Sequence, residues 1–350
     1  MNAPLKNIRV LIVDDSAVVR RVLTQQLALQ PGIEVVGTAP HAAVAWSKIE
    51  ELSPDVVTLD VEMPDMDGVS FLKVLMRERP TPVVMVSSLT KRGAEVTLDA
   101  LDAGAVDFVA KPEMGVDRKL ADLVPEIAEK IRIAAKAKLH RRVERKRVEQ
   151  APSLALAKTT HRVLAIGAST GGTEAIREIL ERLPADAPGV VVVQHMPEAF
   201  TASFAKRCDQ SCAVRVSEAV DEARVLPGHV LIAPGNHHMR LVRRGGNYHV
   251  QITQDEHVNR HRPSVDVLFK SVAQHAAGNA VGIILTGMGA DGAKGLLEMR
   301  LAGAHTIAQD EATCVVFGMP KEAIINGGAE LVLPLPGIAE RALKLFSELP

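Results

Sequence analysis

Residues 9–16 read RVLIVDDS, an apolar run closed by two aspartates and a serine. A short apolar run with polar turn residues behind it predicts a strand that is buried on both faces of its sheet. Comparable runs follow at residues 34–37, 56–60, 83–87 and 106–110, and amphipathic helical patterns fill the gaps between them. Because strands and helices alternate in this way, we expect an α/β fold whose N-terminal domain is a doubly wound sheet of five parallel strands.

The C-terminal half of the chain repeats this alternation from about residue 161 onward. Its strand-like runs lie at residues 163–167, 190–194, 229–233, 280–286 and 306–309. A more polar stretch at 239–253 predicts a β-hairpin with its turn at 243–247. We therefore expect a second α/β domain, whose sheet is mostly parallel with one antiparallel excursion.

The chain has 350 residues, of which 47% are hydrophobic and 24% are charged, as in a protein that folds around buried cores. This length favours two domains, and we assign residues 1–125 and 161–350 to them, with a helical basic linker at 126–160. Within that linker, residues 136–150 hold seven Lys and Arg against two Asp and Glu. A basic run can bind nucleic acid. A solvated helix explains the run as well, and we expect no nucleic-acid partner.

The cysteine content and the N-terminal residues bear on the compartment. The three cysteines form no CxxC pair, so neither a disulfide framework nor a structural zinc site is expected. The first apolar run ends at Asp14, too early for a signal peptide. No run approaches the ~18 apolar residues of a membrane-spanning helix. We therefore expect a cytoplasmic protein that is not inserted in a membrane.

Acidic side chains gather at the carboxyl ends of two predicted strands of the first domain. Asp14 and Asp15 follow the first strand, and Asp60 ends the third. Such ends meet at one edge of a parallel sheet, where three carboxylates would repel one another unless a cation joined them. Oxygen ligands of this kind suit Mg²⁺. Lys111, just past the fifth strand, could pair there with a carboxylate or a phosphoryl oxygen, and Ser87, which ends the fourth strand, offers a hydroxyl.

Four segments of this domain, LIVDDS, VTLDVEMPDMDG, VVMVSS and DFVAKP, resemble the response regulator receiver family across residues 7–125. The resemblance implies that Asp60 is the phosphoacceptor. It also implies a Mg²⁺ site made by Asp14, Asp15, Asp60 and the main-chain carbonyl of Glu62. The resemblance further implies that Ser87 and Lys111 contact the phosphoryl group and that Phe108 occupies the aromatic switch position of the family.

The second domain opens with RVLAIGASTGG at residues 162–172. This segment contains the G-x-S-x-G pattern of a nucleophile elbow, with Ser169 on a tight strand-to-helix turn. Small flanking residues leave the hydroxyl accessible, and the helix N-terminus offers N–H groups and partial positive charge to a developing oxyanion. A glycine-rich turn can also cradle phosphate. A P-loop, however, needs Lys after its last glycine, and here Thr173 follows Gly172.

A serine nucleophile needs a base and an orienting acid. His195 ends the strand that follows the Ser169 helix, so it should face the same edge of the sheet. Asp291 and Asp310 both lie near later strand ends, and spacing alone does not choose between them. The segment GMGADG around Asp291 is also a G-x-G-x-x-G pattern with Asp310 about twenty residues on, which makes a nicotinamide-dependent oxidoreductase the rival. An argument against that rival is that the Asp291 carboxylate would lie where the pyrophosphate of the cofactor must approach the helix N-terminus.

Six segments of this domain resemble the CheB family of protein-glutamate methylesterases over about residues 160–348. They are IGASTGG, VVVQHMP, IAPGNHHM, RPSVDVLF, LTGMGADG and QDEATCVVFGMPKEA. The resemblance implies Ser169 as nucleophile, His195 as base and Asp291 as orienting acid. It further implies an oxyanion donor at the Met288 main-chain N–H, beside Thr170.

The same resemblance implies a reaction and its partners. The reaction is phosphorylation-regulated hydrolysis of glutamate γ-methyl esters on methyl-accepting chemotaxis receptors, together with deamidation of receptor glutamines. The phosphodonor would be a chemotaxis histidine kinase, the catalytic domain would need no cofactor, and the protein would work at the periphery of membrane receptor arrays. A DNA-binding response regulator is a further alternative, but it would carry a basic helix-turn-helix module at its C-terminus, whereas residues 151–350 are near neutral and α/β.

Overall fold

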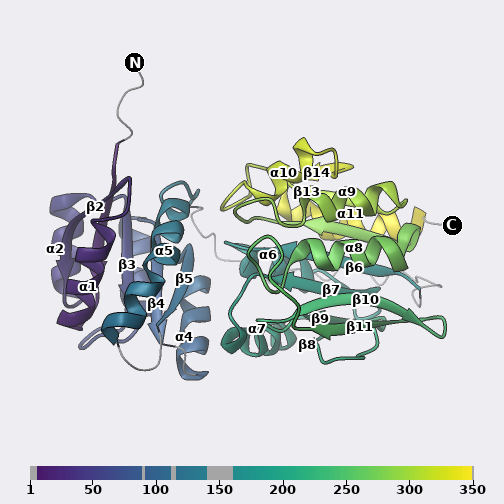
Figure 1. Cartoon of the computed structure of the whole chain (residues 1–350), viewed down its shortest axis with the longest axis horizontal. Helices are drawn as coiled ribbons and strands as arrows, with labels where there is room; N and C mark the ends of the chain where they lie inside the picture. Colours follow the sequence, from purple (N-terminus) through teal and green to yellow (C-terminus); the bar gives the residue numbers. More distant parts are fainter. Residues whose placement is uncertain (1–5, 89–90, 112–115, 140–160, 349–350) are drawn as a thin grey trace, which may run out of the picture. The chain divides into compact units, whose positions relative to one another are not determined.

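A computed structural model describes residues 6–88, 91–111, 116–139 and 161–348 of the chain (Figure 1). The chain divides into two compact units, Met1–Val143 and Glu144–Pro350, each of which contains its own parallel sheet. Within the described ranges, no helix combines the length and the apolar character needed to cross a bilayer.

The N-terminal unit is a doubly wound sheet of five parallel strands in the order β2-β1-β3-β4-β5. Its strands are β1 (Ile8–Val13), β2 (Ile33–Ala39), β3 (Val56–Asp60), β4 (Val83–Ser88) and β5 (Asp107–Lys111). Its helices are α1 (Ala17–Leu27), α2 (Ala42–Leu52), α3 (Gly68–Glu78), α4 (Lys91–Asp102) and α5 (Val116–Ala134). The fold class predicted from the sequence is confirmed for this unit.

Helices cover both faces of this sheet, which is why its strands read as near-continuous apolar runs. α1 and α5 contact each other and lie on one face, while α3 contacts α4 (Figure 1). The central strand β3 is buried at every residue. Side-chain caps help to start two of the helices: Ser16 Oγ accepts a hydrogen bond from the Val19 N–H, and Asp67 Oδ1 accepts one from the Ser70 N–H.

The boundary of this unit lies farther along the chain than the sequence predicted. The predicted domain end at residue 125 falls inside α5, which continues to Ala134. Ile127 and Ile131 in the second half of the helix are fully buried, because α5 packs on α1 and β5. Residues 126–134 therefore belong to the N-terminal unit and not to a linker. Of the predicted basic linker, residues 140–160 lie outside the described part of the chain.

The C-terminal unit contains a seven-stranded parallel sheet in the order β14-β13-β12-β6-β7-β9-β8. Its strands are β6 (Val163–Ala168), β7 (Gly189–Gln194), β8 (Arg215–Glu218), β9 (His229–Ile232), β12 (Ala280–Ile284), β13 (His305–Gln309) and β14 (Leu331–Leu333). Its helices are α6 (Gly172–Glu181), α7 (Glu198–Ser211), α8 (Val265–His275), α9 (Ala293–Leu301), α10 (Met319–Ile325) and α11 (Leu335–Glu348), with a 3₁₀ turn, η1 (Ala277–Asn279).

The predicted hairpin is present, but its expected place within the main sheet is wrong. Strands β10 (His238–Arg244) and β11 (Asn247–Thr253) pair only with each other, as a separate two-stranded sheet. A hairpin completes its ladder through a tight turn and needs no other strand. Its apolar side, with Leu241 and Val250 fully buried, packs on α8 instead. Strands β8 and β14 were not predicted, because their four and three residues are too few to show a hydrophobic period.

In both sheets the strand order reverses beside the first strand of the unit. The reversal lies between β1 and β3 in the N-terminal sheet and between β6 and β12 in the C-terminal sheet. At such a point the loops that leave the carboxyl ends diverge to opposite faces and leave room for a ligand. The residues that directly follow these strands are therefore the ones placed for chemistry.

Candidate active site

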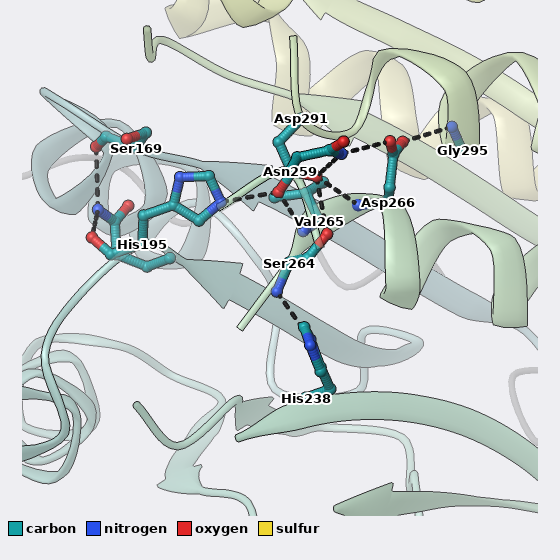
Figure 2. Close-up of polar contacts among 10 residues, drawn as sticks. Ser169, His195, His238, Asn259, Ser264, Val265, Asp266, Asp291 and Gly295 are labelled. Carbon is teal, nitrogen blue, oxygen red and sulfur yellow. Dashed lines mark hydrogen bonds and ion pairs between the residues drawn. The ribbon is translucent and has the colours of Figure 1, made fainter. Parts of the chain in front are cut away.

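Ser169, His195 and Asp291 come together at the carboxyl edge of the seven-stranded sheet (Figure 2). Ser169 directly follows β6 and His195 directly follows β7, and these strands stay in register up to the pair Ala168 and Gln194. The His195 N–H donates to the Ala168 carbonyl at 3.1 Å, so the ladder holds serine and histidine on neighbouring chain segments. Asp291 lies in the turn between β12, which pairs with β6 on its other side, and α9.

The turn that carries Ser169 is built from small residues. Gly171 is the N-cap of α6 and has a φ of +76°, a left-handed conformation that glycine adopts without steric cost. Gly287, in the loop after β12, faces the serine, and a Cβ at this position would lie 2.7 Å from Ser169 Cβ. Only glycine therefore allows this loop to approach the serine so closely.

The two ring nitrogens of His195 have different surroundings. Nε2 lies 2.8 Å from Asp291 Oδ2, while Nδ1 is buried and has no hydrogen-bond partner among the described residues. Figure 2 shows Ser169 and Asp291 on opposite sides of the imidazole. Because an ionised carboxylate can only accept a hydrogen bond, the neutral ring carries its N–H on Nε2 and its lone pair on Nδ1. Nδ1 is thus the nitrogen that can take a proton from a group on the Ser169 side.

Asp291 is held by donors from the segment that leads into α8 (Figure 2). Oδ1 accepts hydrogen bonds from Asn259 Nδ2 and Ser264 Oγ, both at 2.7 Å, and Oδ2 accepts one from the Val265 N–H at 2.7 Å. Burial raises the pKa of Asp291, but the hydrogen bond and charge of His195, with the other donors, outweigh burial and hold the pKa well below its ordinary value. Asp291 is therefore an ionised partner for His195 at neutral pH.

A second cluster lies at the reversal point of the N-terminal sheet. Lys111 Nζ is 2.8 Å from Asp14 Oδ2 and 2.7 Å from Asp60 Oδ2. Asp14, Asp15 and Asp60 offer ligand oxygens that all lie within 4.8 Å of one another. Burial raises the pKa of Asp60 to about 6, where the Lys111 charge opposes the rise and the Asp14 charge adds to it. Clustered carboxylate oxygens are the donor set that Mg²⁺ takes, so these residues fit that ion.

The other residues predicted for this domain surround the cluster. Ser87 is fully buried, and its hydroxyl has no hydrogen-bond partner in the part of the chain that the structure describes. Glu62 is exposed, and its N–H donates to Asp60 Oδ1 at 3.4 Å. Phe108 is 5% exposed, and Lys130 Nζ lies 5.7 Å from the centroid of its ring. Ser87 thus keeps a donor available for a group that enters beside Asp60.

Comparison with known proteins assigns both units. Residues 164–342 match the family model of the CheB methylesterase, and residues 10–121 match that of the response regulator receiver domain. The chain belongs to the CheB methylesterase family. The resemblance drawn from the sequence is confirmed, as are the fold class and the enzyme class, a hydrolase joined to a receiver domain.

Relatives from several bacteria match this chain over nearly its whole length. It is 56% identical over 340 residues to the protein-glutamate methylesterase/protein-glutamine glutaminase of Bordetella parapertussis, which covers 97% of each chain. It is 54% identical over 348 residues to the protein of the same name from Syntrophotalea carbinolica, and the match covers 98% of this chain and 99% of that protein. The crystal structure of the Thermotoga maritima CheB methylesterase catalytic domain matches with a TM-score of 0.52 and 40% identity, over 53% of this chain and 98% of that chain.

In the C-terminal unit, the two candidates for the orienting acid, Asp291 and Asp310, have different contacts. Asp291 bonds His195, whereas Asp310 Oδ1 accepts hydrogen bonds from the N–H and hydroxyl of Thr313, at 3.0 and 2.6 Å, and so closes a local turn. The same contacts argue against a dinucleotide at GMGADG, because the Asp291 carboxylate fills the turn and is already bonded to the Val265 N–H.

Two polar side chains beside the site were missed in the sequence. Gln194 Nε2 donates to the carbonyls of Ser169 at 2.9 Å and His195 at 3.1 Å, which ties the two loops together. Asn259 Nδ2 donates to both Asp291 and Asp266 Oδ2, the latter at 2.8 Å. Asn259 lies in an irregular segment far from the site along the chain, so no pattern marked it. The signal for Gln194 was its position next to His195.

Of the two residues predicted to form the oxyanion site, Thr170 directly follows Ser169, and Met288 directly follows Gly287, which faces the serine. Thr170 is buried, and its carbonyl accepts a hydrogen bond from Thr286 Oγ1 at 3.0 Å. Met288 follows Gly287, and its side chain is 40% exposed. The Gly287 carbonyl accepts hydrogen bonds from the N–H groups of Gly318 and Met319, which hold the main chain of this loop in place.

Proposed function

We propose that this protein hydrolyses glutamate γ-methyl esters on methyl-accepting chemotaxis receptors, and deamidates receptor glutamines, by a Ser-His-Asp mechanism. The observation that carries the proposal is the asymmetry of His195: its Nε2 bonds Asp291, while its Nδ1, which has no partner among the described residues, is turned to the Ser169 side. The names of the relatives supply the substrate class. The receptors would be reached from the cytoplasm, at the periphery of the receptor arrays.

In the proposed first step, Ser169 Oγ attacks the ester carbonyl carbon while His195 Nδ1 takes the hydroxyl proton. The imidazolium that forms carries its positive charge against the ionised Asp291. Collapse of the tetrahedral intermediate breaks the bond to the methoxy oxygen, which leaves as methanol with the proton from Nδ1. Water then attacks the acyl-enzyme with the same proton transfers and releases glutamate.

The oxyanion of the intermediate needs N–H donors close to Ser169. The Met288 N–H and the main chain at Thr170 are proposed for this role, because their loops flank the serine and the helix α6 begins directly after it. A glutamine side chain yields the same acyl-enzyme with ammonia as the leaving group. One site can therefore serve both substrates.

The receiver domain is proposed to regulate this activity through phosphorylation of Asp60. An Asp60 oxygen attacks the phosphorus of a kinase phosphohistidine, the phosphorus–nitrogen bond breaks, and an aspartyl phosphate forms. Lys111 and the Ser87 hydroxyl are proposed to contact the transferred group; Lys111 Nζ lies 2.7 Å from Asp60 Oδ2, and Ser87 Oγ has no hydrogen-bond partner among the described residues. Mg²⁺, when bound, offsets charge on the phosphoryl oxygens. It would be held by Asp14, Asp15, Asp60 and the main-chain carbonyl of Glu62, and Phe108 would couple the modification to the surface.

Methanol release tests the activity directly. Receptor membranes that carry radiolabelled methyl esters are incubated with the full-length protein, and volatile methanol is collected over time. We expect release that depends on the protein and that rises when acetyl phosphate and Mg²⁺ are added, because phosphorylation relieves the control by the receiver domain. Membranes without enzyme are the control. An absence of methanol release in both conditions would contradict the proposed substrate.

Asp60→Asn tests the phosphorylation site. An amide cannot form the aspartyl phosphate, so incorporation from radiolabelled acetyl phosphate should fall to background, and chelation of Mg²⁺ by EDTA should have the same effect on the native protein. Asp65→Asn changes an exposed aspartate of the following loop and should label as the native protein does. Labelling that survives in Asp60→Asn would show that another residue is the acceptor.

A further inference from the structure

The imidazole of His195 lies against a second imidazole. The ring of His261 stacks on it with a centroid distance of 3.7 Å and an angle of 10° between the ring planes. His261 lies in the irregular segment that also supplies Asn259 and Ser264 to Asp291. The face of the His195 ring is therefore covered by a side chain that no step of the mechanism above uses.

We propose that His261 is a positioning residue that holds the plane of the His195 ring and stabilises the imidazolium that forms as Ser169 attacks. The inference rests on the proposed Ser-His-Asp mechanism and deepens it. Two physical arguments support it, one from the torsional freedom of histidine and one from the charge that His195 acquires.

The first argument concerns the second side-chain torsion of His195, which has a broad and shallow energy profile. Nε2 lies closer to the axis of the Cβ–Cγ bond than Nδ1 does. Rotation about that bond consequently displaces Nδ1 more than Nε2. The hydrogen bond from Nε2 to Asp291 therefore constrains the position of Nδ1 only weakly. A ring stacked on the face blocks this rotation and keeps Nδ1 directed to Ser169.

The second argument concerns the near-parallel geometry of the two rings. Neutral aromatic rings prefer offset or edge-to-face arrangements, because their negative faces repel in a close sandwich. A cation over the face of a neutral ring is attracted to it. The observed stacking therefore becomes attractive when His195 is an imidazolium and the ring of His261 is neutral. Because His195 becomes an imidazolium only as Ser169 attacks, this contact is stronger in the transition state than in the resting enzyme.

The backbone around His261 supports a dedicated role. Val258 and His261 exchange main-chain hydrogen bonds at 3.1 and 2.9 Å across a turn whose two central residues, Asn259 and Arg260, have φ values of +52° and +68°. Asparagine tolerates this left-handed conformation, but arginine rarely adopts it, so the turn is strained. The turn directs Asn259 to Asp291 and His261 to His195. A single strained turn thus supports both members of the pair.

The test compares side chains at position 261 in the full-length protein, with methanol release from labelled receptor membranes as the readout. His261→Ala removes the stacked ring, and kcat should fall about tenfold while KM stays unchanged, since the contact acts on the base and not on the substrate. His261→Phe and His261→Tyr restore a neutral ring and should recover most of the lost kcat. His257→Ala, an exposed histidine of the same segment, should keep native kinetics.

Thermal unfolding of each variant is measured beside the kinetics, and Ser169→Ala sets the background rate. The proposal is overturned if His261→Ala keeps native kcat, if its loss appears in KM, or if neither aromatic variant recovers activity above that of the alanine variant. These outcomes are distinct from failure of the proposed function, in which Ser169→Ala itself would retain turnover. Recovery with either ring supports the proposal.

Discussion

Ser169→Ala is expected to lower the turnover of methylated receptors by 10⁵- to 10⁶-fold, on the order found when a serine nucleophile is removed from a hydrolase. Without the hydroxyl no acyl-enzyme can form, and His195 has no proton to take. The remaining main-chain donors can still polarise the ester and assist direct attack by water. A small residual rate above the uncatalysed reaction is therefore expected, and it should not depend on phosphorylation in the way the native rate does.

The variant isolates the chemistry because the serine side chain does little for the structure. The Gln194 amide bonds the Ser169 main-chain carbonyl, and the Ser169 N–H bonds the Thr286 carbonyl at 3.0 Å, so both contacts persist in the alanine variant. We expect Ser169→Ala to keep the native unfolding temperature. The matched control is Ser217→Ala, which changes an exposed serine and should keep native turnover. Methanol release within tenfold of the native rate would exclude Ser169 as the nucleophile.

Asp291→Asn should lower turnover by about 10⁴-fold, the loss expected when the acid that orients a catalytic histidine becomes an amide. An amide nitrogen facing His195 Nε2 favours the tautomer with its proton on Nδ1. The nitrogen that must accept the serine proton is then already protonated. The amide also offers no charge to balance the imidazolium. Methanol release measures the loss, and substrate binding should be unaffected.

Asp310→Asn is the matched control for this experiment. Its Oδ1 only accepts hydrogen bonds from Thr313, which an asparagine side chain can also do, so near-native turnover is expected. The pair therefore separates the two carboxylates that the sequence left open. If Asp310→Asn lost activity and Asp291→Asn did not, the assignment of the acid would be reversed.

The ionisation of Asp291 also links stability to pH. The folded-state pKa is depressed below the ordinary value, so the unfolded state binds the proton more tightly. The stabilisation is present in full above the ordinary carboxyl pKa of about 4 and declines as the pH falls through the folded-state value. Unfolding temperatures measured from neutral pH downward should accordingly fall less in Asp291→Asn than in the native protein.

Much of the fold could be predicted because it is encoded locally. The runs VLIV at residues 10–13 and VVVV at residues 190–193 are apolar throughout, since parallel strands are buried on both faces, and the polar residues that follow them mark the edge where ligands bind. The features that were not predicted are either very short or depend on contacts that form only in the folded unit. β14 is only three residues long, and α5 extends past the predicted boundary because Ile127 and Ile131 gain a partner surface that only the folded unit provides.

The sequence by itself determined the two parallel α/β units and the residues at their strand ends, including Asp60, Ser169 and His195. It did so because strand polarity and turn chemistry are properties of neighbouring residues. Residue spacing left two carboxylates open, and the tertiary structure shows that Asp291 is the one that meets His195. It also shows which nitrogen of that ring has no partner among the described residues, and that Asn259 and His261 support the pair. Those contacts join segments that are distant along the chain, and their geometry exists only once the strand order has brought β6, β7 and β12 side by side.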